Sequence, residues 1–154
     1  MREAPDNTYN VRESMWFDTD RDTAFTGWTD PDAIANWFGP PGYQAEVLEL
    51  DLVSGGRWRF RMVPQVGRPS HHGGRYVEIS RPDRLVFTWE SEEDKHLTNG
   101  RESLVTVTFA EEAGGVRVSI VHEQLPNRSA ADALSYGWSH GIERLSDWLK
   151  RREK

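Results

Sequence analysis

The sequence predicts an α+β fold in which a curved antiparallel sheet of about six to seven strands wraps around a long C-terminal helix, with two short helices after the first strand. Three observations lead to this prediction. Apolar and polar residues alternate in short segments, which is typical of strands with one dry face. The links between these segments are too short for parallel crossovers. After Pro126 the apolar residues recur every three or four positions, as in an amphipathic helix.

Seven segments are expected to form strands, and turn residues separate them. The best defined is 56–63, where Trp58, Phe60 and Met62 share one face while arginines occupy the other. Ser54-Gly55-Gly56 predicts the turn before it, and residues 111–115 predict a hairpin turn later in the chain. The expected strands are residues 9–17, 44–52, 56–63, 72–80, 84–91, 102–110 and 115–123.

The first short helix is expected over residues 22–28, and the second has signals at both of its ends. Asp30 can accept the free amide hydrogens of the first turn, and Pro31 suits the first helical position. Gly39 permits a left-handed cap, and the two prolines that follow it stop the helix. The helix ends on Trp37 and Phe38, which we expect to plug the gap between the long helix and the sheet edge.

The long helix is expected over residues 129–152. Leu134, Trp138, Ile142, Leu145 and Leu149 form its apolar stripe, and the basic residues at its C-terminal end suit the helix dipole. A sheet with one dry face needs a cover, and this helix is the longest element that the sequence offers for it.

Composition narrows the class of protein. A chain of 154 residues is most simply one domain, here residues 1–154 with a core from about 9 to 150. The formal net charge of -6 disfavours nucleic acid and anionic membranes as partners. There is no cysteine, which excludes disulfides and thiolate chemistry. Because the sequence shows neither a signal-peptide core nor a run of roughly 20 apolar residues, we expect a cytoplasmic protein.

Several motifs together resemble one known family. They are Thr29-Asp30-Pro31 with Trp37-Phe38-Gly39-Pro40, the strand at 55–60, the segments at 85–90 and 105–109, and the final helix from Gly137-Trp138 to Trp148-Leu149. The resemblance covers about residues 9–149 and is to the activator-of-Hsp90-ATPase-homologue-1-like (AHSA1-like) family of the START/Bet v 1-like (SRPBCC) superfamily. It implies a helix-grip fold with a deep apolar cavity between sheet and helix. Fold alone implies no single function.

The sequence departs from the eukaryotic co-chaperone that names this family. That protein has a separate N-terminal domain that engages the chaperone, and nothing here corresponds to it. The family name by itself therefore does not imply that this chain activates Hsp90.

Aromatic residues are expected to line the cavity. Seven tryptophans are many for this length, and they serve either as core or as walls of an apolar site. The candidate ligand-binding residues are Trp37, Phe38, Trp58, Phe60, Tyr76, Phe87, Trp89, Phe109, His122, Trp138 and Gly141.

Three positions, two of them in this list, allow two interpretations. Gly137 and Gly141 lie four apart beside the apolar stripe, and each costs about 1 kcal/mol relative to alanine in a helix. They indicate either close helix–sheet packing or room left for a ligand. His122 alternates with Val118 and Ile120 on an apolar face, so it is either a hydrogen-bonded core histidine or a polar anchor and acid/base group at the pocket mouth.

The sequence predicts no cofactor and no metal site. His71 and His72 are adjacent in an expected strand, so their rings point to opposite faces and cannot easily share one ion. No catalytic serine–histidine–aspartate spacing and no phosphate-binding loop is present. The arginines at 57, 59 and 61 form either a salt-bridged surface or a docking site for an acidic partner.

These observations lead to one main hypothesis and two alternatives. The main hypothesis is a domain that binds a small apolar or amphipathic molecule in a cavity. The first alternative is a protein-interaction module, such as a chaperone cofactor or a regulatory or stress-response subunit. The second is a cyclase- or hydrolase-type enzyme that uses His122. The sequence also leaves open whether the protein forms a homodimer.

Overall fold

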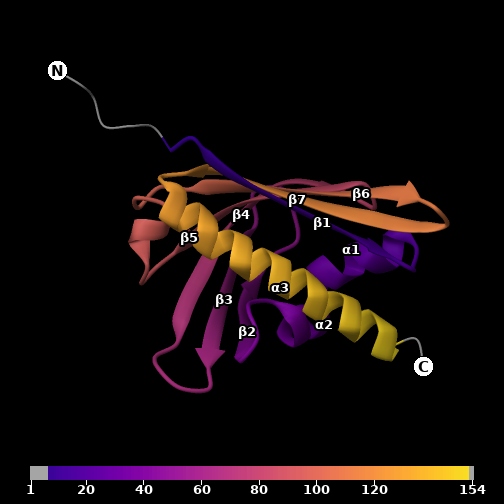
Figure 1. Ribbon diagram of the computed structural model, residues 1–154, viewed down its shortest axis with the longest axis horizontal. Helices are drawn as coiled ribbons and strands as arrows, with labels where there is room; N and C mark the ends of the chain where they lie inside the picture. The colour runs from indigo at the N-terminus through magenta and orange to yellow at the C-terminus, as the bar shows by residue number, and fades with distance from the viewer. Residues whose placement is uncertain (1–6, 153–154) are drawn as a thin grey trace.

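The structure is a computed structural model, and it describes residues 7–152. Seven strands form one antiparallel sheet, as the sequence predicts, and their order is β1-β7-β6-β5-β4-β3-β2 (Figure 1). The elements are β1 (Tyr9–Phe17), α1 (Arg21–Thr29), α2 (Pro31–Trp37), β2 (Tyr43–Leu50), β3 (Arg57–Pro64), β4 (Ser70–Ser80), β5 (Arg84–Ser91), η1 (Lys95–Leu97), β6 (Ser103–Glu112), β7 (Gly115–Leu125) and α3 (Arg128–Arg152).

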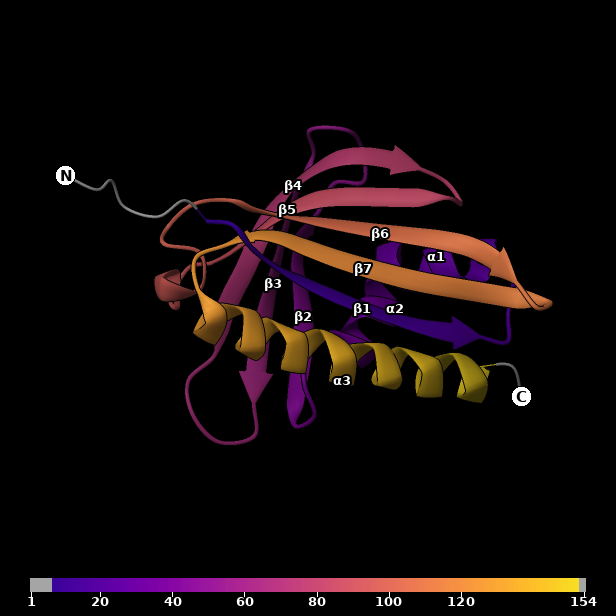
Figure 2. The same cartoon turned by 45° about the horizontal axis from the view of Figure 1, so that its top comes forward.

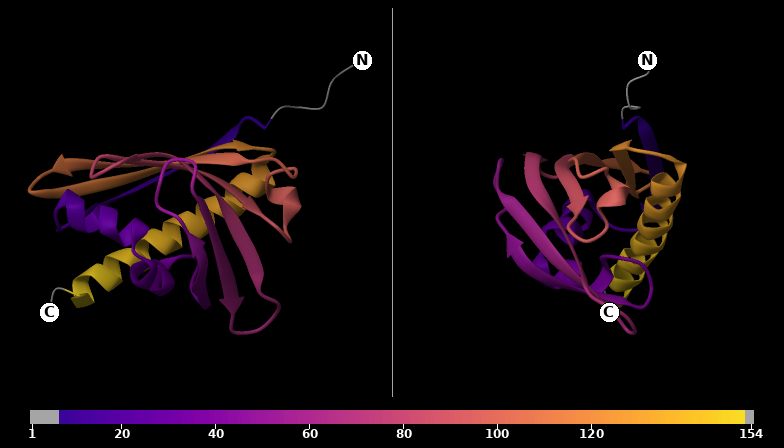
Figure 3. Two further views of the ribbon diagram at one scale, coloured as in Figure 1. Left: turned by 180° about the vertical axis from the view of Figure 1, so that it is seen from behind. Right: turned by 90° about the vertical axis from the view of Figure 1, so that its left-hand side faces the viewer.

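The sheet is strongly curved, and α3 runs along its open side (Figures 2 and 3). Strands β2 and β3 run at a steep angle to β6 and β7 (Figure 1). Gly73 and Gly74 lie in β4, where they are opposite Arg59 and Trp58 of β3. A Cβ on Gly73 would lie 2.7 Å from the carbonyl oxygen of Trp58, and one on Gly74 would overlap the carbonyl of Thr88. Glycine is therefore required here for the close approach of neighbouring strands.

The two short helices, α1 and α2, close one end of the space between the curved sheet and α3, which is called the grip below. Asp20 caps α1 by accepting a 2.7 Å hydrogen bond from the amide of Thr23. Asp30 ends α1 and also caps α2, because its Oδ2 accepts from the amide of Ala33 at 3.0 Å. Gly39 follows with φ of 99°, the left-handed conformation predicted for it.

The differences from the predicted boundaries are small, with one exception. Strand β4 begins at Ser70, two residues before the predicted start, and α3 begins one residue early, capped by Asn127. The exception is the single 3₁₀ turn η1 between β5 and β6, which the sequence analysis missed.

Aromatic side chains fill most of the space between the sheet and α3. Trp37 is 1% exposed, and its Nε1 donates to the carbonyl of Gly27 at 2.7 Å. Phe38 packs edge-to-face on Trp58, Phe60 and Trp138 at 5.1–6.4 Å.

No helix within residues 7–152 has the length and apolar character that crossing a membrane requires.

Candidate functional site

A pocket of about 190 Å³ opens at the end of the grip where α3 begins. The strand ends of β3, β4 and β5, the turn η1 and the segment after α2 surround it. Its apolar walls are Phe38, Pro40, Met62, Trp89, Leu97, Leu134 and Trp138. Such a concave apolar space with few polar groups is typical of a small-molecule site.

Several polar groups of this pocket lie on β4 and beside η1. The Nε2 atom of His72 is 3.4 Å from the Oγ of Ser70, and the ring packs edge-on against Trp89 at 5.0 Å. Burial lowers the pKa of His72 to about 4, so the imidazole is neutral at pH 7. Asp94 adds a carboxylate to the lining. These three residues give the lining a neutral imidazole, a hydroxyl and a carboxylate.

The two helix glycines have different surroundings. A Cβ on Gly137 would meet no atom within 4 Å, and Gly137 lines the pocket. A Cβ on Gly141 would lie 3.5 Å from the ring of Trp37. Gly137 thus leaves space at the pocket, whereas Gly141 packs on the core.

His122 lies behind the pocket wall and is 0% exposed. Its Nδ1 accepts a 3.0 Å hydrogen bond from the Nε1 of Trp138, and its Nε2 lies 2.7 Å from the Oγ of Ser103. Burial lowers the pKa of His122 to about 3. The ring is therefore neutral and hydrogen-bonded on both sides, which supports the core interpretation rather than that of an anchor at the mouth.

The predicted cavity residues separate into three groups. Phe38, Trp89 and Trp138 line the open pocket. Five others surround, together with Phe38, a deeper void of about 20 Å³; they are Trp37, Trp58, Phe60, Tyr76 and Phe87. Phe109 packs on Phe25 at a centroid distance of 5.1 Å, while His122 and Gly141 contact other core residues. The protein's own side chains therefore occupy most of the volume of the expected deep cavity.

Several lining residues were missed by sequence reasoning: Tyr43, Met62, Ser70, His72, Leu97 and Tyr136. The sequence does contain a signal for His72. Adjacent residues in a strand point to opposite faces of the sheet, so one of the two histidines must face inward. His72 pairs with Phe60 across β3 and β4, so both side chains share the dry face. No periodic signal marks Leu97, which lies in η1.

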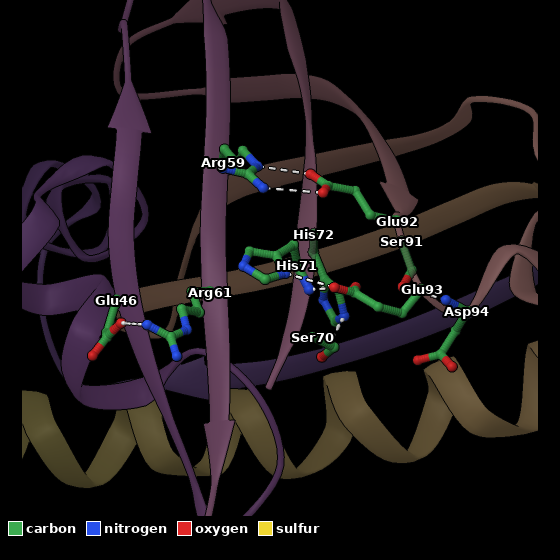
Figure 4. A network of polar contacts seen from close by, with 10 residues as sticks. All are labelled: Glu46, Arg59, Arg61, Ser70, His71, His72, Ser91, Glu92, Glu93 and Asp94. Carbon is green, nitrogen blue, oxygen red and sulfur yellow. Dashed lines mark hydrogen bonds and ion pairs between the residues drawn. The ribbon is translucent and has the colours of Figure 1, made fainter. Parts of the chain in front are cut away.

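The other histidine of the pair belongs to an ion-pair network on the outer face (Figure 4). His71 Nδ1 lies 2.6 Å from Glu93, and Arg59 makes a two-point contact with Glu92 at 2.7 and 3.0 Å. Arg61 pairs with Glu46 at 3.5 Å, so two of the three arginines on this face of β3 form ion pairs, which supports the salt-bridged interpretation for them. His71, Glu92 and Glu93 offer ligand atoms within 4.8 Å of one another, but a cation there would have to displace these partners.

Solved structures of other proteins share this architecture. No curated protein matches the chain. Among solved structures, a protein from Chromobacterium violaceum is 25% identical with a TM-score of 0.81, over 90% of this chain and 95% of that one. The AHSA1 protein from Silicibacter pomeroyi is 23% identical with a TM-score of 0.82, over 94% and 99%. DynU16, from the dynemicin biosynthetic locus, is 24% identical with a TM-score of 0.71, over 95% of this chain and 48% of DynU16.

The match to a family covers most of the chain and agrees with the motifs noted in the sequence. Residues 18–150 match the family described as activator of Hsp90 ATPase homolog 1-like protein. With the helix-grip architecture described above, this match assigns the chain: it belongs to the AHSA1-like family.

Proposed function

We propose that this protein binds a small apolar or amphipathic molecule in the pocket beside Gly137. The observation that carries the proposal is the open, aromatic-walled space of about 190 Å³ at a helix position that lacks a side chain. Glycine in a helix interior costs about 1 kcal/mol relative to alanine. A ligand that occupies the open space beside Gly137 would explain why glycine is present despite its cost to helix stability.

The pocket volume limits the size of the ligand. An apolar cavity of about 150 Å³ accommodates benzene, whereas sites for drug-sized ligands span about 300–1,000 Å³. A pocket of about 190 Å³ therefore suits a single aromatic ring or a short branched chain. His72 and Ser70 would orient a polar substituent on that ring.

The enzymatic alternative relies on His122 as an acid or base. Its two ring nitrogens already face Trp138 and Ser103, and its pKa of about 3 keeps the ring unprotonated at pH 7. Proton transfer to a substrate would require this network to break. The geometry favours a positioning role for His122, so binding is the stronger proposal.

The test places a larger side chain on α3 so that it fills the pocket. Ethylbenzene and p-cresol serve as single-ring probes, and binding is followed by isothermal titration calorimetry. Because a leucine side chain at position 137 would occupy the space, Gly137→Leu is expected to weaken both probes at least tenfold.

Gly137→Ala is the matched control. It adds one methyl group where no atom lies within 4 Å, so it should keep binding within about twofold while raising helix propensity. If neither probe binds the unmodified protein at millimolar concentration, or if Gly137→Leu binds them as well as the unmodified protein does, the proposal fails.

A further inference from the structure

A second space lies deeper in the core than the proposed binding pocket. Its volume of about 20 Å³ is close to that of one water molecule. Its lining is aromatic and aliphatic, with no lysine, arginine, histidine or carboxylate among the lining residues. A charged group placed there would lose its hydration without gaining a counter-ion.

Trp28 lines this void and carries an unused hydrogen-bond donor. The residue is 4% exposed and lines the void, and its Nε1 has no hydrogen-bond partner among residues 7–152. By contrast, Nε1 of Trp37 donates to Gly27 and Nε1 of Trp58 donates to Thr88. A buried donor without an acceptor is costly, and few exist in folded proteins. Such a group calls for an acceptor, and none is provided by the part of the chain that the structure describes.

Phe38 is shared by this void and the open pocket. It is among the lining residues of both, so the two spaces meet at this side chain. Trp138 links the two spaces as well, because it lines the pocket and its ring stacks on Trp28 at 5.7 Å. An apolar ligand in the pocket therefore has a short route towards the Trp28 indole.

Resting on the proposed function, we infer that the ligand extends past Phe38 and places a neutral hydrogen-bond acceptor on Nε1 of Trp28. The ligand class is a single-ring or short-chain apolar molecule that ends in a ketone, ester or similar carbonyl. A carboxylate is disfavoured because no cation lines the void. Tyr76 also lines the void, and burial raises the pKa of its phenol, so this hydroxyl stays protonated as a second donor.

A matched pair of probes tests this inference. 4-Phenylbutan-2-one and butylbenzene share one carbon skeleton and differ in the carbonyl oxygen. The ketone is expected to move the indole N–H proton resonance of Trp28 downfield in ¹H–¹⁵N spectra, whereas butylbenzene leaves it without that shift. Trp28→Phe identifies the resonance by its disappearance.

Affinities give the second measurement. Trp28→Phe should weaken the ketone about tenfold and change butylbenzene by less than threefold. Trp37→Phe is the control, since it trims another tryptophan of the void whose N–H is already used; it should affect both probes alike.

Two results would overturn the inference, and they are distinguishable. If both probes bind, the Trp28 resonance does not move and Trp28→Phe weakens both equally, the acceptor site is wrong while the binding pocket stands. If neither probe binds the unmodified protein, the proposed function fails and this inference fails with it.

Discussion

The indole Nε1 of Trp138 in α3 donates a 3.0 Å hydrogen bond to Nδ1 of His122 in β7. An indole can only donate, so Nδ1 of the imidazole must be unprotonated. The proton therefore lies on Nε2, which donates to Oγ of Ser103 at 2.7 Å, and Ser103 in turn donates to the carbonyl of Trp89 at 2.6 Å. One chain of hydrogen bonds thus ties α3 to three neighbouring strands behind the pocket wall.

The first prediction concerns pH. The pKa of His122 is about 3 in the folded state and near 6.5 in the unfolded chain. Below pH 6.5 the unfolded state binds a proton that the folded state does not, so stability falls with acidity by up to about 1.4 kcal/mol per pH unit. Urea unfolding at pH 7 and pH 4.5 should show a loss of about 2–3 kcal/mol from this residue.

His122→Gln isolates that contribution. The variant has no titrating ring, so its free energy of unfolding should fall less steeply between pH 6.5 and 4.5 than that of the unmodified protein. All other titratable groups are the same in both proteins, so their contributions cancel in the difference. Equal slopes in the two proteins would contradict the assigned protonation state.

The second prediction concerns the middle of the hydrogen-bond chain. Ser103→Ala leaves the Nε2 proton of His122 and the carbonyl of Trp89 without their partner in a buried site. The expected loss is about 1–3 kcal/mol of unfolding free energy, measured by urea denaturation at pH 7. Ser139→Ala on the surface of α3 is the control and should change stability by under about 0.5 kcal/mol. A loss no larger than this control would argue against the network.

The fold was predictable because its signals are local. Alternation in β3 placed Trp58, Phe60 and Met62 inside, and all three are buried. Asp30 and Gly39 set the ends of α2 by cap chemistry that depends on a few neighbouring residues. The turn η1 was missed because a single 3₁₀ turn has neither a period nor a strong cap.

The site was only partly predictable, because its shape depends on which side chains fill the grip. Alternation shows that Phe60, Phe87 and His122 face inward, but it cannot show that Trp37 and Phe38 occupy the space between them. Gly137 and Gly141 also look equivalent in the sequence, although their neighbours in the structure differ. Only the packing of Trp37 on α3 distinguishes them.

The third prediction uses those two glycines as a matched pair. Leucine at 141 must fit against the ring of Trp37, which lies 3.5 Å from the position of its Cβ, whereas leucine at 137 enters open space. Gly141→Leu should lower the unfolding free energy by about 1–3 kcal/mol through overpacking. Gly137→Leu should hold or raise it, because glycine is the poorer helix former. Thermal or urea unfolding of the two variants gives the comparison, and equal stabilities would contradict the packing described here.

The fourth prediction concerns the segment that follows α2. Arg144 of α3 donates to the carbonyls of Gly39 at 2.9 Å, Pro40 at 3.1 Å and Asn36 at 3.3 Å, and its partial burial lowers the guanidinium pKa. Because Gly39 and Pro40 line the pocket, this side chain holds one of its walls to the helix.

Replacing Arg144 with methionine keeps an apolar stem and removes all three hydrogen bonds. The expected cost is about 1–2 kcal/mol of unfolding free energy, since bonds from a charged donor are worth more than neutral ones but this group is partly exposed. The loss should be local, so amide hydrogen exchange should speed up at residues 38–43 while the core strands β6 and β7 keep their protection relative to global stability. Arg151→Met, at an exposed position near the end of α3, is the control and should leave exchange at 38–43 unchanged. Unchanged exchange at this segment in Arg144→Met would mean that the wall is held by the packing of Phe38 on its aromatic neighbours rather than by the guanidinium.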